Sequence, residues 1–277
     1  MRALHGPRAL RERFRRVLGR SGEAVLATLA DMARGDIELR VDEFDGVFAI
    51  NPRSELFRRL LRFRQYEPEL AQVFRAHVDP CRDIVDVGAN IGFFTVLGAK
   101  ALRGGRVLAV EPTGAAFARL VANAARNGVA DRVIAFNGAA AAAEGQFAMN
   151  VVPGREEYSS VGALVHPRVR GAPQVLETVP ATTLDALVAR HDLHPGIVKV
   201  DVEGAEHLVF EGARMLLERH RPVVISELAQ PLLRACGADA RDIIRLFERL
   251  DYRVSDPVDP GAPPGSKVQG DILCVPK

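Results

Sequence analysis

Apolar positions from Asp83 onward alternate between two patterns. Short, continuous apolar runs are typical of strands buried on both faces, and they alternate with stretches whose apolar residues recur at helical spacing. The predicted strands cover residues 84–87, 107–110, 133–136, 197–202, 223–226, 252–254 and 272–275. The predicted helices cover 93–101, 115–126, 206–218 and a last segment with Ile243, Ile244, Phe247 and Leu250. Residues 137–196 show neither pattern clearly and are predicted to be irregular. The alternation predicts βαβ units around a parallel sheet.

The chain before Asp83 has a different organisation. Residues 1–35 have a helical pattern, and two short alternating runs at 37–41 and 47–50 flank a turn sequence, which predicts a β-hairpin. Another helix is predicted to begin at Pro68, because proline is tolerated in the first turn of a helix. We therefore divide the chain into an N-terminal extension of helix and short strands, residues 1–60, and one larger domain, residues 61–277.

Composition limits the class of protein. The chain has 277 residues, of which 48% are hydrophobic, and 37 Lys and Arg nearly balance 35 Asp and Glu. This balance gives no reason to expect a nucleic-acid partner. The three cysteines are far apart and form neither a zinc motif nor a disulfide framework. Because no apolar run is long enough to cross a bilayer and no signal-peptide pattern begins the chain, we expect a cytoplasmic protein.

Positive charge is concentrated near the N-terminus. Residues 1–20 carry many arginines against the single acidic residue Glu12, and apolar residues recur among them at roughly helical spacing. Two interpretations stay open. One is a helix that packs on the domain or is solvated, and the other is a basic amphipathic helix that contacts an anionic membrane surface or a partner.

A glycine-containing turn connects the predicted strand 84–87 to the helix 93–101. Its sequence is Val85-Asp86-Val87-Gly88-Ala89-Asn90-Ile91-Gly92. A strand that turns directly into a helix can offer free backbone N–H groups and the positive helix end to a polar ligand. In the dinucleotide motif G-x-G-x-x-G, however, glycines would replace Asn90 and Phe93. A carboxylate at Asp86 would also repel a pyrophosphate, so the pattern argues against NAD.

A second acidic residue, Glu111, ends the next predicted strand and is followed by Pro112. A carboxylate at this place can accept hydrogen bonds from both ribose hydroxyls of an adenosine group. Since the carboxyl ends of parallel strands meet at one edge of the sheet, Asp86, Asn90 and Glu111 are expected to lie together. They predict a binding site for a nucleoside ligand.

Four segments of the chain resemble the S-adenosylmethionine-dependent methyltransferases of the FkbM family. They are Tyr66-Glu67-Pro68, the glycine turn continued to Thr95, Val110-Glu111-Pro112, and Ile197-Val198-Lys199-Val200-Asp201-Val202-Glu203-Gly204-Ala205-Glu206. The resemblance covers roughly residues 60–275. It implies an α/β, Rossmann-like class I methyltransferase fold, with a seven-stranded mixed sheet, helices on both faces and an antiparallel last strand.

The resemblance also implies S-adenosylmethionine as the cofactor and the residues that bind it. These are Tyr66, Asp86, Gly88, Ala89, Asn90, Gly92, Glu111, Pro112, Asn137, Gly138 and Asp201. Alanines follow the third strand where the family often has an acidic residue near the adenine, so Asn137 or Gly138 is expected to make those contacts. Similar proteins methylate hydroxyls of sugars, polyketides and other small metabolites, so the expected partner is a small-molecule acceptor.

Charged residues end the predicted strands 197–202 and 223–226. Lys199, Asp201 and Glu203 would share one face of a strand, either as a structural network of charges or as part of the catalytic site. Methyl transfer to an alcohol needs a base or a metal. Asp201 is the first candidate for the base, Glu203 and Glu227 are further catalytic candidates, and Asp201 with Glu227 could hold a divalent metal.

Other candidates are less specific. His166 and His207 are possible bases, although a lone histidine is more often structural. Residues 157–162 either close the acceptor site or form an ordinary polar turn. For the whole chain, the alternatives are an oxidoreductase that uses a nucleotide or NAD on a related fold, and a non-catalytic binding module. The acceptor, the metal dependence and the oligomeric state cannot be predicted from these residues.

Overall fold

The computed structural model describes residues 35–153, 159, 171, 173–262 and 269–277. Three predictions lie outside these residues: the basic helix before residue 35, His166, and the segment 157–162 apart from Ser159. Nothing in the structure bears on them.

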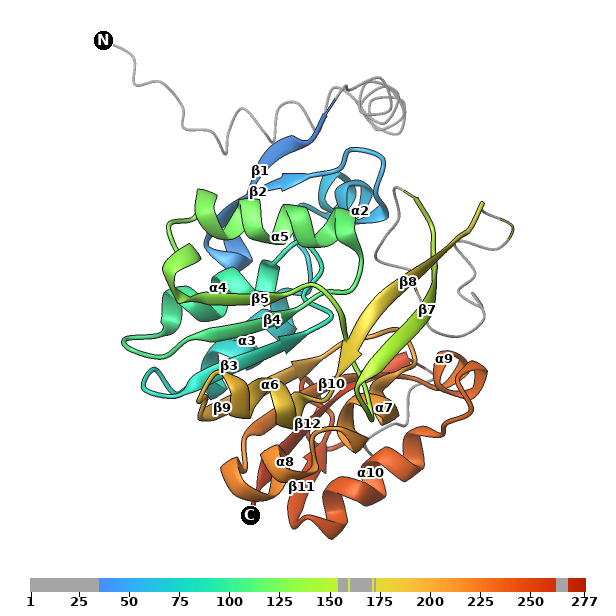
Figure 1. The fold of residues 1–277 in the computed structure, drawn as a ribbon. Helices are drawn as coiled ribbons and strands as arrows, with labels where there is room; N and C mark the ends of the chain where they lie inside the picture. Colours follow the sequence, from blue (N-terminus) through green and yellow to red (C-terminus); the bar gives the residue numbers. More distant parts are fainter. Residues whose placement is uncertain (1–34, 154–158, 160–170, 172, 263–268) are drawn as a thin grey trace.

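A seven-stranded sheet forms the centre of the molecule, in the order β11-β12-β10-β9-β3-β4-β5 (Figure 1). The strands are β3 Asp83–Val87, β4 Val107–Val110, β5 Val133–Phe136, β9 Pro195–Val200, β10 Val223–Ala229, β11 Tyr252–Ser255 and β12 Gln269–Pro276. The β3, β4, β5, β9 and β10 strands pair in parallel, whereas β12 runs antiparallel to both β10 and β11. The predicted mixed α/β sheet with an antiparallel last strand is confirmed.

Helices cover both faces of this sheet because its strands are apolar on both faces (Figure 1). In β3, Ile84 packs in one core and its neighbours Val85 and Val87 pack in the other, as the pleat requires. On the Ile84 side lie α2 Glu55–Phe63, α3 Pro68–His77, α4 Phe93–Ala101 and α5 Gly114–Arg126. On the other side lie α6 Leu184–Arg190, α7 Glu206–Glu211, α8 Arg214–His220, α9 Gln230–Ala235 and α10 Ala240–Arg249.

The predicted N-terminal hairpin is present as β1 Ile37–Val41 and β2 Gly46–Ile50, joined by the short 3-10 turn Asp42–Phe44. Two asparagines of α5 bind its backbone. Asn123 Oδ1 accepts a hydrogen bond from Ala49 N at 2.8 Å, and Asn127 Nδ2 donates one to Val47 O at 2.8 Å. The hairpin residue Phe48 also packs in the core on the Ile84 side. The boundary predicted after residue 60 lies within α2.

The prediction that residues 137–196 are irregular is wrong. It contains the strands β6 Ala139–Ala140, β7 Gly145–Val151 and β8 Val175–Thr182, which form a separate sheet in the order β6-β8-β7, and then α6. In β7, Met149 and Val151 are buried, whereas Ala148 and Asn150 next to them are more exposed, so the alternation exists. Alanines and Pro180 weaken the apolar signal of these strands, which is why the pattern does not reveal them.

The single helix predicted at 206–218 is also wrong, because Gly212 separates α7 from α8. A Cβ at Gly212 would lie 2.0 Å from the carbonyl oxygen of Ala141, so the backbones of two segments meet there. The helices α2 and α9 were not predicted. Among the residues that the structure describes, no helix is both long enough and apolar enough to span a membrane.

Candidate functional site

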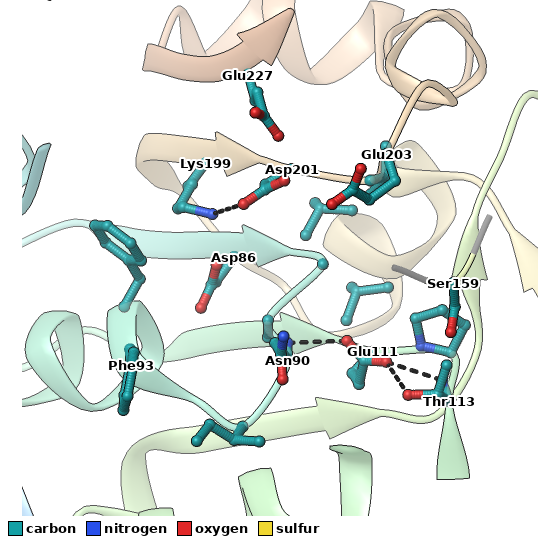
Figure 2. A pocket seen from close by; sticks show the side chains of 18 of the residues that line it. Asp86, Asn90, Phe93, Glu111, Thr113, Ser159, Lys199, Asp201, Glu203 and Glu227 are labelled. Carbon is teal, nitrogen blue, oxygen red and sulfur yellow. Dashed lines mark hydrogen bonds and ion pairs between the residues drawn. The ribbon is translucent and has the colours of Figure 1, made fainter. Parts of the chain in front are cut away.

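A cavity of about 660 Å³ lies at the carboxyl ends of β3, β4, β9 and β10 (Figure 2). Its lining includes most of the predicted cofactor residues: Tyr66, Asp86, Gly88, Ala89, Asn90, Glu111, Pro112 and Asp201. The predicted catalytic residues Glu203 and Glu227 also line it. Gly92, Asn137 and Gly138 do not. The structure therefore brings together side chains from four strands that are far apart in the sequence, at the edge of the sheet where ligands of such folds bind.

The glycine turn after β3 is shaped by a close backbone contact. Gly88 has φ of 74°, and a Cβ there would lie 1.8 Å from the carbonyl oxygen of Asp201, so a side chain cannot be accommodated. Asn90 is also left-handed, with φ of 50°. Gly92, at φ of 93°, begins α4 and lies against Leu120, so it shapes the turn from behind the cavity.

Several N–H groups of this turn are already used, which differs from the expectation of free donors. Gly88 N and Ala89 N both donate to the carbonyl oxygen of Val110, at 2.9 and 3.0 Å, and Asn90 N donates to Glu111 Oε2 at 2.9 Å. These donors are not available to a phosphate. The turn therefore contributes close approach and shape, and charged ligand groups must be recognised mainly by side chains.

Glu111 is fixed in the wall of the cavity. Its Oε1 accepts hydrogen bonds from the N–H and the hydroxyl of Thr113 at 2.9 and 2.6 Å, and its Oε2 accepts from Asn90 N (Figure 2). Burial raises the pKa of Glu111, and these hydrogen bonds oppose that shift. Oε1 already accepts two hydrogen bonds, whereas Oε2 accepts one and keeps a further lone pair, so the oriented group can still accept a hydrogen bond from a ligand hydroxyl at Oε2.

Asn137 and Gly138 support Glu111 rather than the cavity itself. Asn137 Nδ2 donates to the carbonyl oxygens of Glu111 and Pro112 at 2.9 and 3.1 Å, and Gly138 N donates to that of Glu111 at 3.2 Å. They hold the backbone that carries the Glu111 side chain. The predicted adenine contacts at these two residues stay a prediction.

Lys199 is the buried cation of the site. Only 4% of it is exposed, its Nζ lies 3.2 Å from Asp201 Oδ2, and it lies 4.7 Å from the centre of the Phe94 ring. Burial alone would lower the pKa of Lys199, but the charges of Asp201, Asp86 and Glu67 outweigh it and raise the pKa. Lys199 is therefore charged, and it balances several carboxylates at once.

Asp86 lies on the same face of the sheet as Lys199, and its neighbours satisfy it only in part. Its Oδ2 accepts a hydrogen bond from Thr95 Oγ1 at 2.6 Å, whereas its buried Oδ1 has no hydrogen-bond partner in the described part of the chain. Burial is the main reason that the pKa of Asp86 is raised. A carboxylate of this kind suits a positively charged ligand group nearby.

Three carboxylates form a group opposite the glycine turn. One carboxylate oxygen from each of Asp201, Glu203 and Glu227 lies within 4.8 Å of the other two (Figure 2). Burial would raise the pKa of Asp201, but Lys199 and a hydrogen bond with Glu227 lower it. Oxygen ligands of this type suit a divalent cation such as Mg²⁺, so the metal predicted at Asp201 and Glu227 stays a hypothesis.

Glu203 reaches this group by a turn, not by the strand alternation that was predicted. The strand β9 ends at Val200, and Glu203 has a left-handed φ of 54°. Glu206 holds the turn, because its Oε1 accepts hydrogen bonds from the N–H groups of Val202 and Gly204 at 3.3 and 3.2 Å. His207, the other candidate base, follows Glu206 and does not line the cavity.

Glu67 also lines the cavity, although it was not among the predicted site residues. It is the residue before α3 and adopts φ of 45° and ψ of 51°, in the left-handed region. That conformation costs a non-glycine residue on the order of 1–2 kcal/mol, and a following proline normally favours extended backbone. The position of Glu67 between Tyr66 and Pro68 is the sequence signal that could have identified it.

The chemistry of this lining fits S-adenosylmethionine. Glu111 suits a ribose hydroxyl, and the acidic surroundings of Asp86 and Asp201 suit the ammonium and sulfonium charges. With the order of strands in the sheet, these features define a Rossmann-like methyltransferase.

Residues 86–254, more than half of the chain, match the model of the Methyltransferase FkbM domain. The chain belongs to this family and has the fold of S-adenosylmethionine-dependent methyltransferases. No curated protein gives a match to the chain.

Solved structures with a similar fold include an FkbM methyltransferase from Methylobacillus flagellatus KT, at 17% identity and a TM-score of 0.45. That alignment covers 70% of this chain and 43% of the other, so this chain spans less than half of that protein's length. An O-methyltransferase from Bacillus cereus in complex with SAH aligns over 97% of each chain, at 16% identity and a TM-score of 0.41.

Proposed function

We propose that the protein transfers a methyl group from S-adenosylmethionine to a hydroxyl group of a small metabolite, such as a sugar or a polyketide. One observation carries this proposal: a single cavity contains the oriented Glu111 at one part of its wall and the carboxylates of Asp201, Glu203 and Glu227 at another. Its volume of about 660 Å³ is in the range of small-molecule sites, roughly 300–1,000 Å³.

The mechanism requires the chain mainly to bind and orient. Bound S-adenosylmethionine supplies a methyl carbon that is activated by its positively charged sulfur. Glu111 would hold the ribose, and Asp86 with Asp201 would stabilise positive charge on the cofactor. The acceptor hydroxyl would lie near the carboxylate group of Asp201, Glu203 and Glu227, which can accept its hydrogen bonds and keep it close to the methyl carbon.

Methylation of oxygen, rather than of carbon or nitrogen, is the finer part of this proposal. It is supported by the carboxylates in the cavity, since removal of a hydroxyl proton needs a base within hydrogen-bond reach. Because the chain belongs to a methyltransferase family, we no longer consider the oxidoreductase alternative. A binding module without turnover is the remaining alternative, and turnover distinguishes it.

Calorimetry with S-adenosylhomocysteine and with NAD tests the cofactor, and we expect only the former to bind. The acceptor is tested by incubating the full chain with methyl-tritiated S-adenosylmethionine and a small-molecule extract of cells that encode it, followed by separation of the labelled products. A product that loses its label under ether-cleaving conditions supports O-methylation. Label on carbon or nitrogen contradicts it, and binding of S-adenosylhomocysteine without any transfer indicates a binding module.

A further inference from the structure

The first candidate for the general base, Asp201, is already engaged. Its Oδ2 forms an ion pair with Lys199 Nζ at 3.2 Å, and its carboxylate also hydrogen bonds with Glu227. These contacts stabilise the charged form and make the carboxylate a weak base. Because of this ion pair, Asp201 is suited to stabilise positive charge in the cavity. Another group is better suited to take a proton.

Glu67 is a carboxylate on the same cavity, and within the described part of the chain it forms no ion pair as close as that of Asp201, although the charge of Lys199 acts on it too. It precedes α3, yet its side chain makes no capping hydrogen bond to this helix within the described residues. Its carbonyl oxygen accepts the hydrogen bond from Ala71 N at 3.0 Å, so the backbone of Glu67 is fixed to the helix. The left-handed conformation before Pro68 is thus maintained while the side chain lines the cavity.

Tyr66 positions the Glu67 carboxylate. The Tyr66 hydroxyl lowers the pKa of Glu67, and burial is the main reason that the pKa of Tyr66 itself is well above its ordinary value, so the phenol keeps its proton. The ring lies 5.4 Å from the Phe93 ring, and the Arg59 guanidinium lies 4.8 Å from its centre. Tyr66 N also donates to Glu43 Oε1 at 2.7 Å, which fixes the backbone.

We propose that Glu67 is the catalytic base of methyl transfer, with Tyr66 as its positioning residue, and that Asp201 is an electrostatic partner of Lys199. The acceptor's O–H bond breaks and its proton passes to a carboxylate oxygen of Glu67. The acceptor oxygen forms the new bond to the methyl carbon, and the electron pair of the methyl–sulfur bond stays on sulfur. Glu67 then releases the proton to water. This inference rests on the proposed O-methylation.

The charges around Glu67 support this role. Burial and then the negative charge of Asp201 raise the pKa of Glu67, while Lys199, the Tyr66 hydroxyl and Arg59 act in the opposite direction. Asp271 on β12 is a further carboxylate that interacts with Glu67. A raised pKa makes the ionised carboxylate a stronger base than an ordinary glutamate.

Glu67→Gln tests the proposal, because the amide keeps the shape of the side chain and cannot take the proton. Glu69→Gln is the matched control, since Glu69 is exposed in the first turn of the same helix and does not line the cavity. Tyr66→Phe tests the positioning role. For each full-length variant, calorimetry measures binding of S-adenosylhomocysteine, and the tritium assay with the cell extract measures transfer between pH 5 and 9.

We expect all variants to bind S-adenosylhomocysteine. Turnover of Glu67→Gln should fall by roughly 10²- to 10⁴-fold, and its pH profile should lose the acidic limb. Tyr66→Phe removes a hydrogen bond that lowers the pKa of Glu67, so its acidic limb should move to higher pH. A Glu67→Gln variant as active as Glu69→Gln overturns the assignment, and so does an unmoved limb in Tyr66→Phe. Wild-type protein that binds S-adenosylhomocysteine without transfer overturns the proposed function instead.

Discussion

At the scale of single residues, the site depends on carboxylates whose orientation is fixed by short local contacts. Glu111 is the clearest example, because the N–H groups of Asn90 and Thr113 and the Thr113 hydroxyl all donate to it. The glycine turn and the end of β4 are therefore joined through one side chain. A ligand that binds Glu111 meets an acceptor that needs little reorganisation.

Glu111→Gln should weaken cofactor binding. The amide has one acceptor oxygen fewer, and its NH₂ group faces donors that hydrogen bond to the carboxylate in the wild type. The loss matters because hydrogen bonds to charged groups contribute about 1.5–3 kcal/mol each. We expect the Kd for S-adenosylhomocysteine to rise by about 10-fold or more in calorimetry. Glu69→Gln is again a suitable control, and an unchanged Kd in Glu111→Gln would show that Glu111 does not contact the nucleoside.

At the scale of elements, the connection between β9 and α7 is held by the first residue of that helix. Glu206 is 1% exposed, and its Oε2 is buried without a hydrogen-bond partner among the described residues. Burial is the main cause that raises the pKa of Glu206 to about 7, against the hydrogen bonds to its Oε1. The connection that carries Asp201 and Glu203 is thus coupled to a titrating group outside the cavity.

Stability should therefore fall as pH rises through this pKa. The folded pKa of about 7 lies above the ordinary value of 4.5, so the folded state binds more protons between these values. The contribution of Glu206 is complete below about pH 4.5 and lost by about pH 7, with a size on the order of 3 kcal/mol. Glu206→Gln should be more stable than wild type at pH 8 in thermal unfolding and show a flatter pH dependence. Asp271, whose pKa is also raised to about 7, titrates in both proteins, so their difference isolates Glu206.

The elements that the sequence predicts well are those whose signal is local and strong. The strands around Val87 and Val110 are continuous apolar runs, and α4 begins at a glycine turn, so their bounds follow from periodicity. The sheet of β7 and β8 depends on pairing between segments far apart in the chain, and the break at Gly212 depends on the backbone of Ala141. Neither is visible within one window of sequence.

In the site, too, the residues with a local signal can be predicted and those that depend on three-dimensional contacts cannot. Strand ends identify Asp86, Glu111 and Asp201, because parallel strands place their carboxyl ends together. Glu67 enters the cavity through a left-handed conformation before a proline, which local propensity disfavours. The ion pair with Lys199, which changes the chemistry of Asp201, is a matter of distance in three dimensions.

At the scale of the molecule, the hairpin β1–β2 is an integral part of the core. Phe44 and Phe48 are fully buried, and the Phe48 ring lies 4.5 Å from that of Phe93 in the first turn of α4. Asn123 of α5 connects the same hairpin to the cofactor turn, since its Nδ2 donates to Ile91 O at 2.9 Å. Damage to the hairpin should therefore affect the stability of the whole domain.

Phe48→Ala tests this connection. Truncation of a fully buried phenylalanine costs about 3–5 kcal/mol through lost burial and a remaining cavity. Phe63→Ala is the matched control, because Phe63 is 55% exposed and should cost less than about 0.5 kcal/mol. Urea unfolding followed by circular dichroism measures both. Equal midpoints would show that the hairpin folds separately from the sheet.

The cavity wall formed by α2 and the residues before α3 lies outside the matched family segment, which begins at Asp86. The residues from Asp86 onward that are proposed to hold the methyl donor and the pair Tyr66 and Glu67 thus belong to separate segments of the chain. This separation has a use in protein engineering. On the roles proposed above, a chimera joined just before β3 would exchange the wall that carries Tyr66 and Glu67 between two members of the family while each keeps its own residues from Asp86 onward, so new acceptor preferences can be sought by recombination at one junction.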